Sequence, residues 1–161
     1  KVVWYETTAT ADPEVLRNGH DRTVDESDNG YWCEPGDAID YSFAEPVRRA
    51  GVRLVFDSNL SRHYKEHRMK YHYPLNDPGT PVASGLVRSF RVEVRAPETA
   101  NAGSAPSRSA QWQTVAEITD NRQRLTRVEL PDRPIGGVRL TPLATWGDEL
   151  VHIYAFEVEG R

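Results

Sequence analysis

The stretch 37–59 constrains the fold most, because its apolar residues recur at every second position on both sides of a short break. A period of two is typical of strands that bury one face. Glu45-Pro46 and Ala50-Gly51 are expected to break the pattern, which gives two strands joined by a tight connection. The inward positions are Ile39, Tyr41, Phe43, Val52, Leu54 and Phe56.

Similar alternation predicts further strands on either side of this pair. They are expected at 2–8, 89–95, 112–119, 125–130, 137–141 and 151–159. Asp12 and Pro13 predict one helical turn, with Asp12 as its cap. We assign Trp4 and Trp112 to the core, and Tyr154, Phe156 and Val158 to one face of the last strand. The prediction is an all-β antiparallel jelly-roll β-sandwich of about eight strands.

The 161 residues fit one domain covering 1–161. A net charge of −4 argues against a nucleic acid as partner, and no apolar run is long enough for a membrane span. The single Cys33 excludes an internal disulfide and leaves the redox compartment open. Because the chain begins at Lys1 without a methionine, we expect it to be the C-terminal fragment of a larger protein.

Several motifs in order and spacing resemble the galactose-binding-like, discoidin or F5/8 type C jelly roll. They are Asn18-Gly19, Trp32, Phe43-Ala44-Glu45-Pro46, Val52-Arg53-Leu54 with Phe56, and 156–160. A narrower resemblance is to the C-terminal sandwich domain of large bacterial FAD-dependent oxidoreductases. It rests on 55–60, 86–93 and Asn121-Arg122-Gln123-Arg124.

The resemblance implies a non-catalytic module attached to an enzyme, which either binds carbohydrate or packs on the catalytic part. Its partners would be an upstream catalytic domain of the same chain and a carbohydrate. A secreted, periplasmic or cell-surface location is slightly favoured. The chain has no Gly-x-Gly-x-x-Gly after a strand, so no cofactor is expected in this domain and a flavin would bind upstream.

Many members of the broad superfamily hold a structural calcium beside the first loop, and here Asn18, Asp21 and Thr23 stand at the expected loop positions. Calcium takes six to eight oxygen ligands. The position usually held by a last-strand Glu is Ala155 in this chain, with Glu157 two residues later. Calcium is therefore not favoured, and the acidic loop 21–30 is interpreted as solvated.

Aromatic side chains on loops are candidates for ligand binding, because a ring face can stack on the apolar face of a pyranose. The segment 60–87 is long for a connection and combines aromatic, Arg and His residues, so we expect it to bind a ligand or to pack on the catalytic domain. The candidates for ligand or interface binding are Tyr31, Trp32, Arg62, His63, Tyr64, His67, Arg68, Tyr71, Tyr73 and Trp146.

A catalytic or metal site in the same segment is not expected. The spacing of His63, His67 and His72 suits a metal clamp only on a helix, and the prolines that follow argue for irregular chain. A hydrolase could be assembled on paper from Ser58 or Ser61 with His63 and Asp57. No strand-to-helix elbow or oxyanion loop frames them, so we predict no enzyme activity for this domain.

Overall fold

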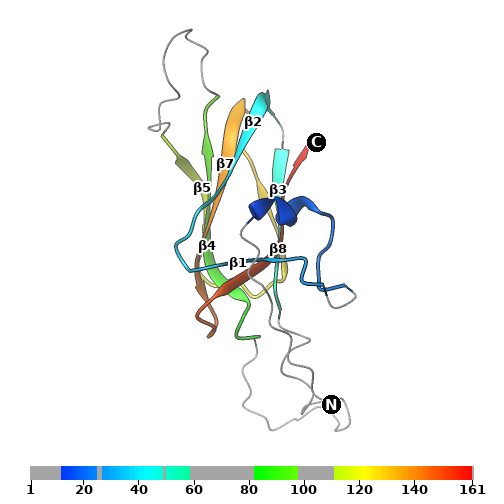
Figure 1. Cartoon of the computed structure of the whole chain (residues 1–161). Coiled ribbons are helices and arrows are strands. Elements are labelled where there is room, and N and C mark those ends of the chain that lie inside the picture. Colours follow the sequence, from blue (N-terminus) through cyan, green and yellow to red (C-terminus); the bar gives the residue numbers. More distant parts are fainter. Residues whose placement is uncertain (1–11, 25–26, 49, 59–81, 98–110, 161) are drawn as a thin grey trace, which may run out of the picture.

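The chain forms a sandwich of two four-stranded sheets (Figure 1). A computed structural model describes residues 12–24, 27–48, 50–58, 82–97 and 111–160. Along these residues, a short 3-10 helix precedes eight strands. Their bounds are η1 (Pro13–Arg17), β1 (Tyr31–Cys33), β2 (Ile39–Val47), β3 (Ala50–Phe56), β4 (Val87–Arg95), β5 (Gln113–Ile118), β6 (Leu125–Glu129), β7 (Ile135–Thr145) and β8 (Val151–Gly160).

All strand pairs are antiparallel. One sheet has the order β1-β8-β3-β6 and the other the order β2-β7-β4-β5. Among these strands, only β4 and β5 are both consecutive in sequence and paired, and every other step along the chain passes from one sheet to the other. This wrapping is that of a jelly roll, so the predicted fold is confirmed.

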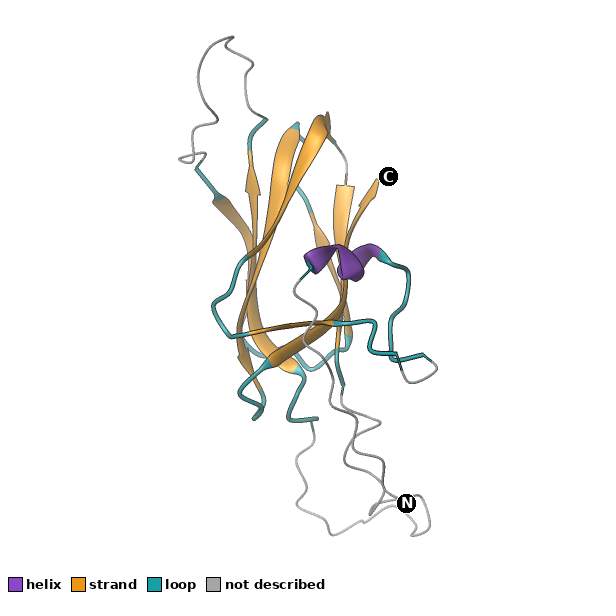
Figure 2. Ribbon diagram, viewed as in Figure 1, coloured by secondary structure: helices purple, strands orange, loops and turns teal. Residues whose placement is uncertain are grey.

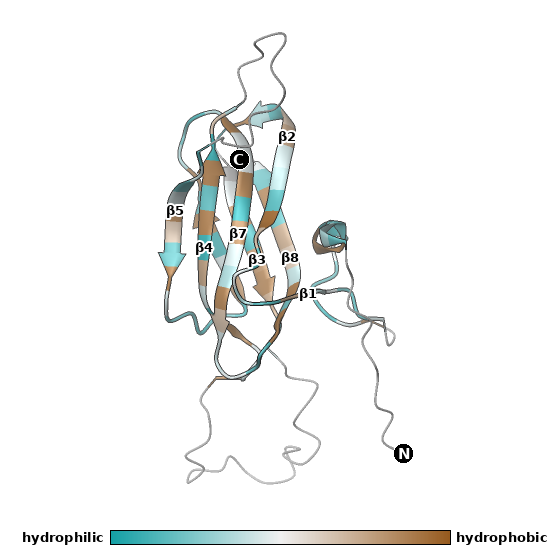
Figure 3. Ribbon diagram, turned by 60° about the vertical axis from the view of Figure 1, so that its left-hand side comes forward, coloured by the Kyte–Doolittle hydropathy of each residue, from teal (hydrophilic) through white to brown (hydrophobic). Residues whose placement is uncertain are grey.

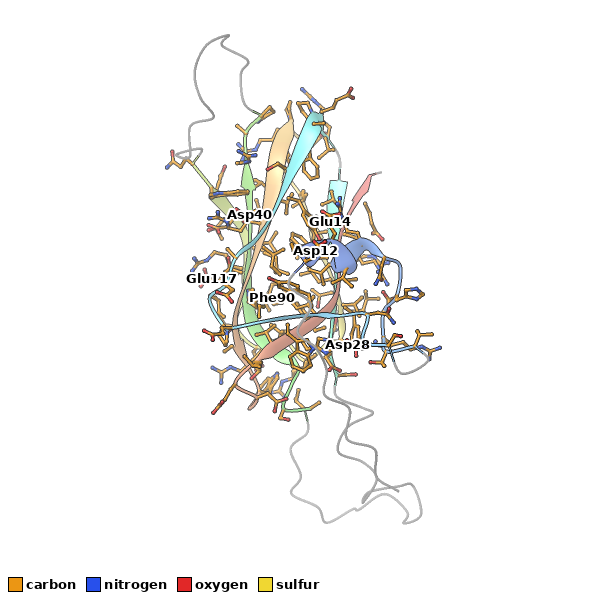
Figure 4. The ribbon with its side chains drawn as sticks, viewed as in Figure 1. Asp12, Glu14, Asp28, Asp40, Phe90 and Glu117 are labelled. Carbon is orange, nitrogen blue, oxygen red and sulfur yellow. The ribbon has the colours of Figure 1, made fainter. Side chains whose placement is uncertain are left out.

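The core lies between the sheets. Phe56, Phe90 and Phe156 are fully buried, and the rings of Phe56 and Phe90 lie 5.1 Å apart between centroids. Figure 4 shows Phe90 in the space between the two layers. The predicted inward positions are buried except Phe43, which is half-buried. Along β4 and β7, hydrophobic and hydrophilic bands alternate (Figure 3), as expected where one face of a strand is in water.

The helix η1 packs beside β8 and matches the predicted turn (Figure 2). Asp12 Oδ1 accepts a hydrogen bond of 2.9 Å from the Glu14 amide, and Pro13 takes the first helical position. Leu16 is fully buried. Gly19, in the following Asn18-Gly19 pair, has a φ of 81°, which glycine adopts without a steric penalty.

The predicted breaks in the central segment are wrong. β2 continues through Glu45-Pro46 to Val47, and β3 already begins at Ala50. Proline is tolerated here because β2 is an edge strand whose register with β7 is irregular between Ser42 and Val47. The tight connection joins strands of different sheets, so it is not a hairpin.

The alternation along β8 is interrupted by a bulge. Val55 pairs with Ala155 and Phe56 with Ile153, which leaves Tyr154 as the additional residue. Tyr154 therefore clusters with Val55 and Ala155, outside the main core that holds Ile153 and Phe156. The prediction that Tyr154 shares a face with Phe156 is wrong.

Two further predictions need correction. β7 covers Ile135–Thr145, well beyond the expected 137–141. Trp112 is absent from the core and is instead half-buried beside charged side chains. The guanidinium carbons of Arg139 and Arg95 lie 4.3 Å and 5.6 Å from the centroid of its ring. Arginine stacking thus covers an indole that the sequence pattern had assigned to the interior.

The predicted strands at 89–95 and 112–119 pair as β4 and β5, while the predicted strand 2–8 lies outside the described residues. Within the part of the chain described here, no helix is long and apolar enough to cross a membrane.

Candidate functional site

Trp146 lies on the loop between β7 and β8, where this loop meets two other connections. Its backbone amide donates to the carbonyl of Leu86, just before β4, at 3.0 Å. Its indole Nε1 donates to the carbonyl of Asn121, between β5 and β6, at 2.7 Å. The indole is half-buried and packs in part on the core. Three segments distant in sequence therefore fix the ring of Trp146 in place.

Asn121 connects this loop cluster to the sheet. Its side chain is buried, and Nδ2 donates to the carbonyls of Val87 at 2.8 Å and Gln123 at 3.0 Å. Oδ1 accepts from the Gln123 amide at 3.0 Å, and the Asn121 amide donates to the carbonyl of Arg88 at 2.8 Å. These bonds orient the Asn121 carbonyl that receives the indole of Trp146.

Two arginines flank the ring of Trp146. The guanidinium carbons of Arg122 and Arg88 lie 5.1 Å and 5.9 Å from its centroid. Arg122 Nε pairs with Asp120 Oδ2 at 3.3 Å, whereas Arg88 forms no ion pair with any described residue. The half-exposed ring and the guanidinium groups over it offer aromatic surface and several hydrogen-bond donors together.

The sequence identified Trp146 but not the side chains around it. Arg122 and Arg88 appear there only within the motifs of the narrower resemblance, Asn121-Arg122-Gln123-Arg124 and 86–93. Their proximity follows from the antiparallel order of the sheet, which brings the ends of β4, β5 and β7 to the same side. No local motif marks it.

Trp32 lies in β1 and is part of a different cluster. Its ring stacks on His152 with centroids 4.0 Å apart and planes 6° apart, and its Nε1 donates to Asp28 Oδ2 at 2.7 Å. One ring face is therefore covered by the protein itself. The neighbouring Tyr31 is half-buried against the main core. The structure thus does not bring Tyr31 and Trp32 into the Trp146 site.

His152 is buried, with 2% of its side chain exposed, between two carboxylates of which Asp28 lies beside β1 in Figure 4. Its Nδ1 is 2.8 Å from Asp57 Oδ2 and its Nε2 is 3.0 Å from Asp28 Oδ1. A Cβ at Gly30 would overlap Nε2, so only glycine leaves room for the imidazole. The network attaches the acidic loop to β8 and β3, which corrects the interpretation of that loop as merely solvated.

The hydrogen bonds and charges of this network shift the pKa values of Asp28 and His152. Burial would raise the pKa of Asp28, but hydrogen bonds from His152, Trp32 and Gly30 hold it at about 2 instead of 3.8. Burial would lower the pKa of His152, but its bonds to Asp28 and Asp57 outweigh that effect and raise it. Only the charged imidazole donates to both carboxylates. Sequence analysis did not single out His152. In the structure, residues 151–156 are all buried, so both faces of this part of β8 are covered by the protein.

The residues considered for calcium make contacts within the protein. Arg53 binds Asp21 and also Glu157, the latter at 2.7 Å. Thr23 Oγ1 lies 3.1 Å from the hydroxyl of Tyr154, and Asn18 Oδ1 accepts from the His20 amide at 2.7 Å. Within the described ranges, no group of three or more His, Cys, Asp or Glu side chains is arranged to hold a metal. The expectation about calcium stays a prediction.

The remaining candidates lie in the segment 59–81, outside the described residues. They are Arg62, His63, Tyr64, His67, Arg68, Tyr71 and Tyr73. The binding or interface role predicted for them therefore stays a prediction. Of the hydrolase set, Ser58 is half-buried and Asp57 is hydrogen-bonded to His152.

The fold is shared with known carbohydrate-binding modules. The family 32 carbohydrate-binding module from Streptococcus pneumoniae EndoD superposes with a TM-score of 0.62 at 10% identity, over 98% of this chain and 91% of that one. Chitosan-binding module 2 of a chitosanase/glucanase from Paenibacillus sp. IK-5, in complex with chitotriose, gives 0.59 at 14% identity, over 95% and 89%. An F5/8 type C domain from Bacteroides fragilis gives 0.54 at 12% identity, over 92% and 80%.

No protein-family model and no curated protein matches this sequence. At such low identities the structural matches show the fold alone, which is the galactose-binding-like sandwich that the resemblance implied. The narrower resemblance to a domain of FAD-dependent oxidoreductases receives no support from them and stays a prediction.

Proposed function

We propose that this chain is a non-catalytic carbohydrate-binding module and that Trp146, with Arg88 and Arg122, forms its sugar-binding surface. An indole face suits the apolar C–H face of a pyranose, while guanidinium groups donate to its hydroxyls. The observation on which the proposal depends is the fixation of a half-exposed Trp146 by the carbonyls of Asn121 and Leu86. A ring held before the ligand arrives loses little entropy on binding.

The fold neighbours support this proposal. They include one module solved with bound GalNAc and another solved in complex with chitotriose. By analogy, we propose that this module serves a larger carbohydrate-active enzyme outside the cell, with a catalytic domain of the same chain as its partner. The segment 60–87 offers the alternative of a contact with that domain, which stays a prediction.

The experiment is a titration of the chain with a panel of neutral, acidic and amino oligosaccharides, followed by calorimetry. Trp146→Ala is the test variant, and Trp112→Ala is its matched control because Trp112 is also a half-buried indole beside two arginines. We expect Trp146→Ala to weaken binding about tenfold or more, in line with the loss of an aromatic anchor. Trp112→Ala should leave binding unchanged.

Loss of binding in Trp112→Ala alone would move the site to the outer face of the β2-β7-β4-β5 sheet. If no sugar in the panel binds, carbohydrate binding is refuted. Interface formation through the segment 60–87 would then be the remaining function.

A further inference from the structure

We infer that the sugar bound at Trp146 bears an acidic group, a carboxylate or a sulfate. This inference rests on the proposed function, because it names the class of ligand for the same site. Its basis is a pair of guanidinium groups at the indole: Arg88 and Arg122 both lie over the ring of Trp146, and of these two only Arg122 forms an ion pair with a described carboxylate.

Arg122 remains available to a ligand despite that partner. Asp120 pairs with its Nε at 3.3 Å, and both side chains are more than half exposed. Such an exposed pair contributes little and exchanges readily with water or a ligand. The two Nη groups of Arg122 donate to no described residue, so the guanidinium fork can bind a carboxylate or sulfate on two atoms.

Arg88 forms no ion pair with a described residue, so its guanidinium is open to a ligand. It lies at an exposed position of β4, and its guanidinium carbon lies 5.9 Å from the centroid of the Trp146 ring. Asp148 and Glu149 follow Trp146 in the loop, but neither forms an ion pair with Arg88 or Arg122 in the described structure. A ligand anion between the two guanidinium groups would supply the charge that the protein does not.

The same geometry disfavours the other classes of sugar. The ammonium groups of a glucosamine oligomer would be repelled by two guanidinium groups at the ring. A neutral pyranose would stack on Trp146 but would form no charge-assisted hydrogen bond through an anionic group of its own. We therefore expect the order of affinity to be acidic, then neutral, then amino sugar.

The test compares four trisaccharides of similar size on the whole chain by calorimetry: trigalacturonate, a sulfated galactose trimer, the neutral galactose trimer and chitotriose. At low salt, we expect an acidic trimer to bind about tenfold tighter than the neutral one, as charge-assisted hydrogen bonds are roughly twice as strong as neutral ones. The advantage should shrink at about 0.5 M salt because the exposed charges are screened. The two acidic trimers distinguish carboxylate from sulfate as the source of the anion.

Arg88→Gln is the test variant, and Arg127→Gln is the matched control, because Arg127 is an exposed arginine of β6 paired with Glu159 at 3.5 Å. We expect Arg88→Gln to weaken binding of the acidic trimer much more than binding of the neutral trimer, which loses only a donor to a hydroxyl, and so to remove most of the preference. Arg127→Gln, with the same change in net charge, should keep the preference.

Equal binding of acidic and neutral trimers, or equal effects of Arg88→Gln and Arg127→Gln, would overturn this inference and leave the sugar-binding proposal standing. Tighter binding of chitotriose than of the acidic trimers would also overturn it. Failure of all four trimers to bind would refute both.

Discussion

Replacing Asp28 with asparagine should destabilise the fold in a way that depends on pH. Asp28 accepts hydrogen bonds from His152, Trp32 and the amide of Gly30, and 10% of its side chain is exposed. The introduced side-chain amide would be neutral and would offer one acceptor oxygen in place of two. The substitution therefore removes a charge-assisted contact to His152 while it keeps the size of the side chain.

The expected magnitude follows from the pKa of Asp28. Folding lowers it from 3.8 to about 2, and each pKa unit corresponds to about 1.4 kcal/mol, so the ionised carboxylate stabilises the fold by about 2 to 3 kcal/mol. Because the folded pKa is depressed, this stabilisation is complete above about 3.8 and is lost as the pH falls through about 2. At pH 3 the difference between wild type and Asp28→Asn should be smaller by about 1 kcal/mol than at pH 5.5.

His152 sets the upper end of the pH range in which the network stabilises the fold. Its folded pKa is raised above the ordinary 6.5, so its contribution is complete below about 6.5 and is lost as the pH rises through the folded value. The network should thus be strongest between about pH 4 and pH 6.5. In Asp28→Asn the alkaline decline should be shallower, because His152 has lost one of its two carboxylates.

The assay is urea unfolding at pH 3, 5.5 and 8, followed by circular dichroism. Asp120→Asn is the control, because its side chain is 63% exposed and its loss should change stability by less than about 0.5 kcal/mol. If Asp28→Asn matched this control at pH 5.5, or lost the same free energy at pH 3 and 5.5, the reasoning about an ionised Asp28 would be refuted.

Three further predictions concern packing and ions. Phe56→Ala should lower the free energy of unfolding by about 3–5 kcal/mol, and a loss under about 1 kcal/mol in urea would contradict its central place in the core. Gly30→Ala should lower the free energy of unfolding by about 1–3 kcal/mol, because the new Cβ would displace His152. Gly160→Ala should leave it unchanged, because a Cβ there meets open space. Equal melting temperatures of the two variants would count against the close contact at Gly30. Millimolar calcium should raise the melting temperature no more than magnesium does, because Arg53 already binds the nearby carboxylates; a rise of many degrees with calcium alone would contradict the expectation that calcium is not bound.

The strands were predictable because burial imposes alternation. Val52, Leu54 and Phe56 alternate in the sequence and are fully buried in β3. The bulge at Tyr154 was not predictable, since the apolar pattern continues unbroken through it and only the pairing with β3 reveals the extra residue. The assignment of Trp112 failed because an indole can be covered by arginine side chains as well as by the core.

The candidate site was predictable only in part. Trp146 was recognisable as an aromatic residue on a loop. Its hydrogen bond to the carbonyl of Asn121 and its contact with Arg88 join segments far apart in the chain. Such contacts depend on strand order, which alternation alone does not give. His152 could not be predicted as part of a network, because a single histidine within an apolar strand belongs to no motif with a characteristic spacing.

The length of β8 has a practical consequence for handling the protein. Its ten residues, Val151–Gly160, start beside the loop of Trp146 and end at the opposite end of the sandwich (Figure 1). At about 3.3 Å per residue, they separate the two ends by about 30 Å. A biotin tag or a sensor-chip linker joined after Gly160 would therefore place the Trp146 loop at the end of the domain that lies away from the chip surface.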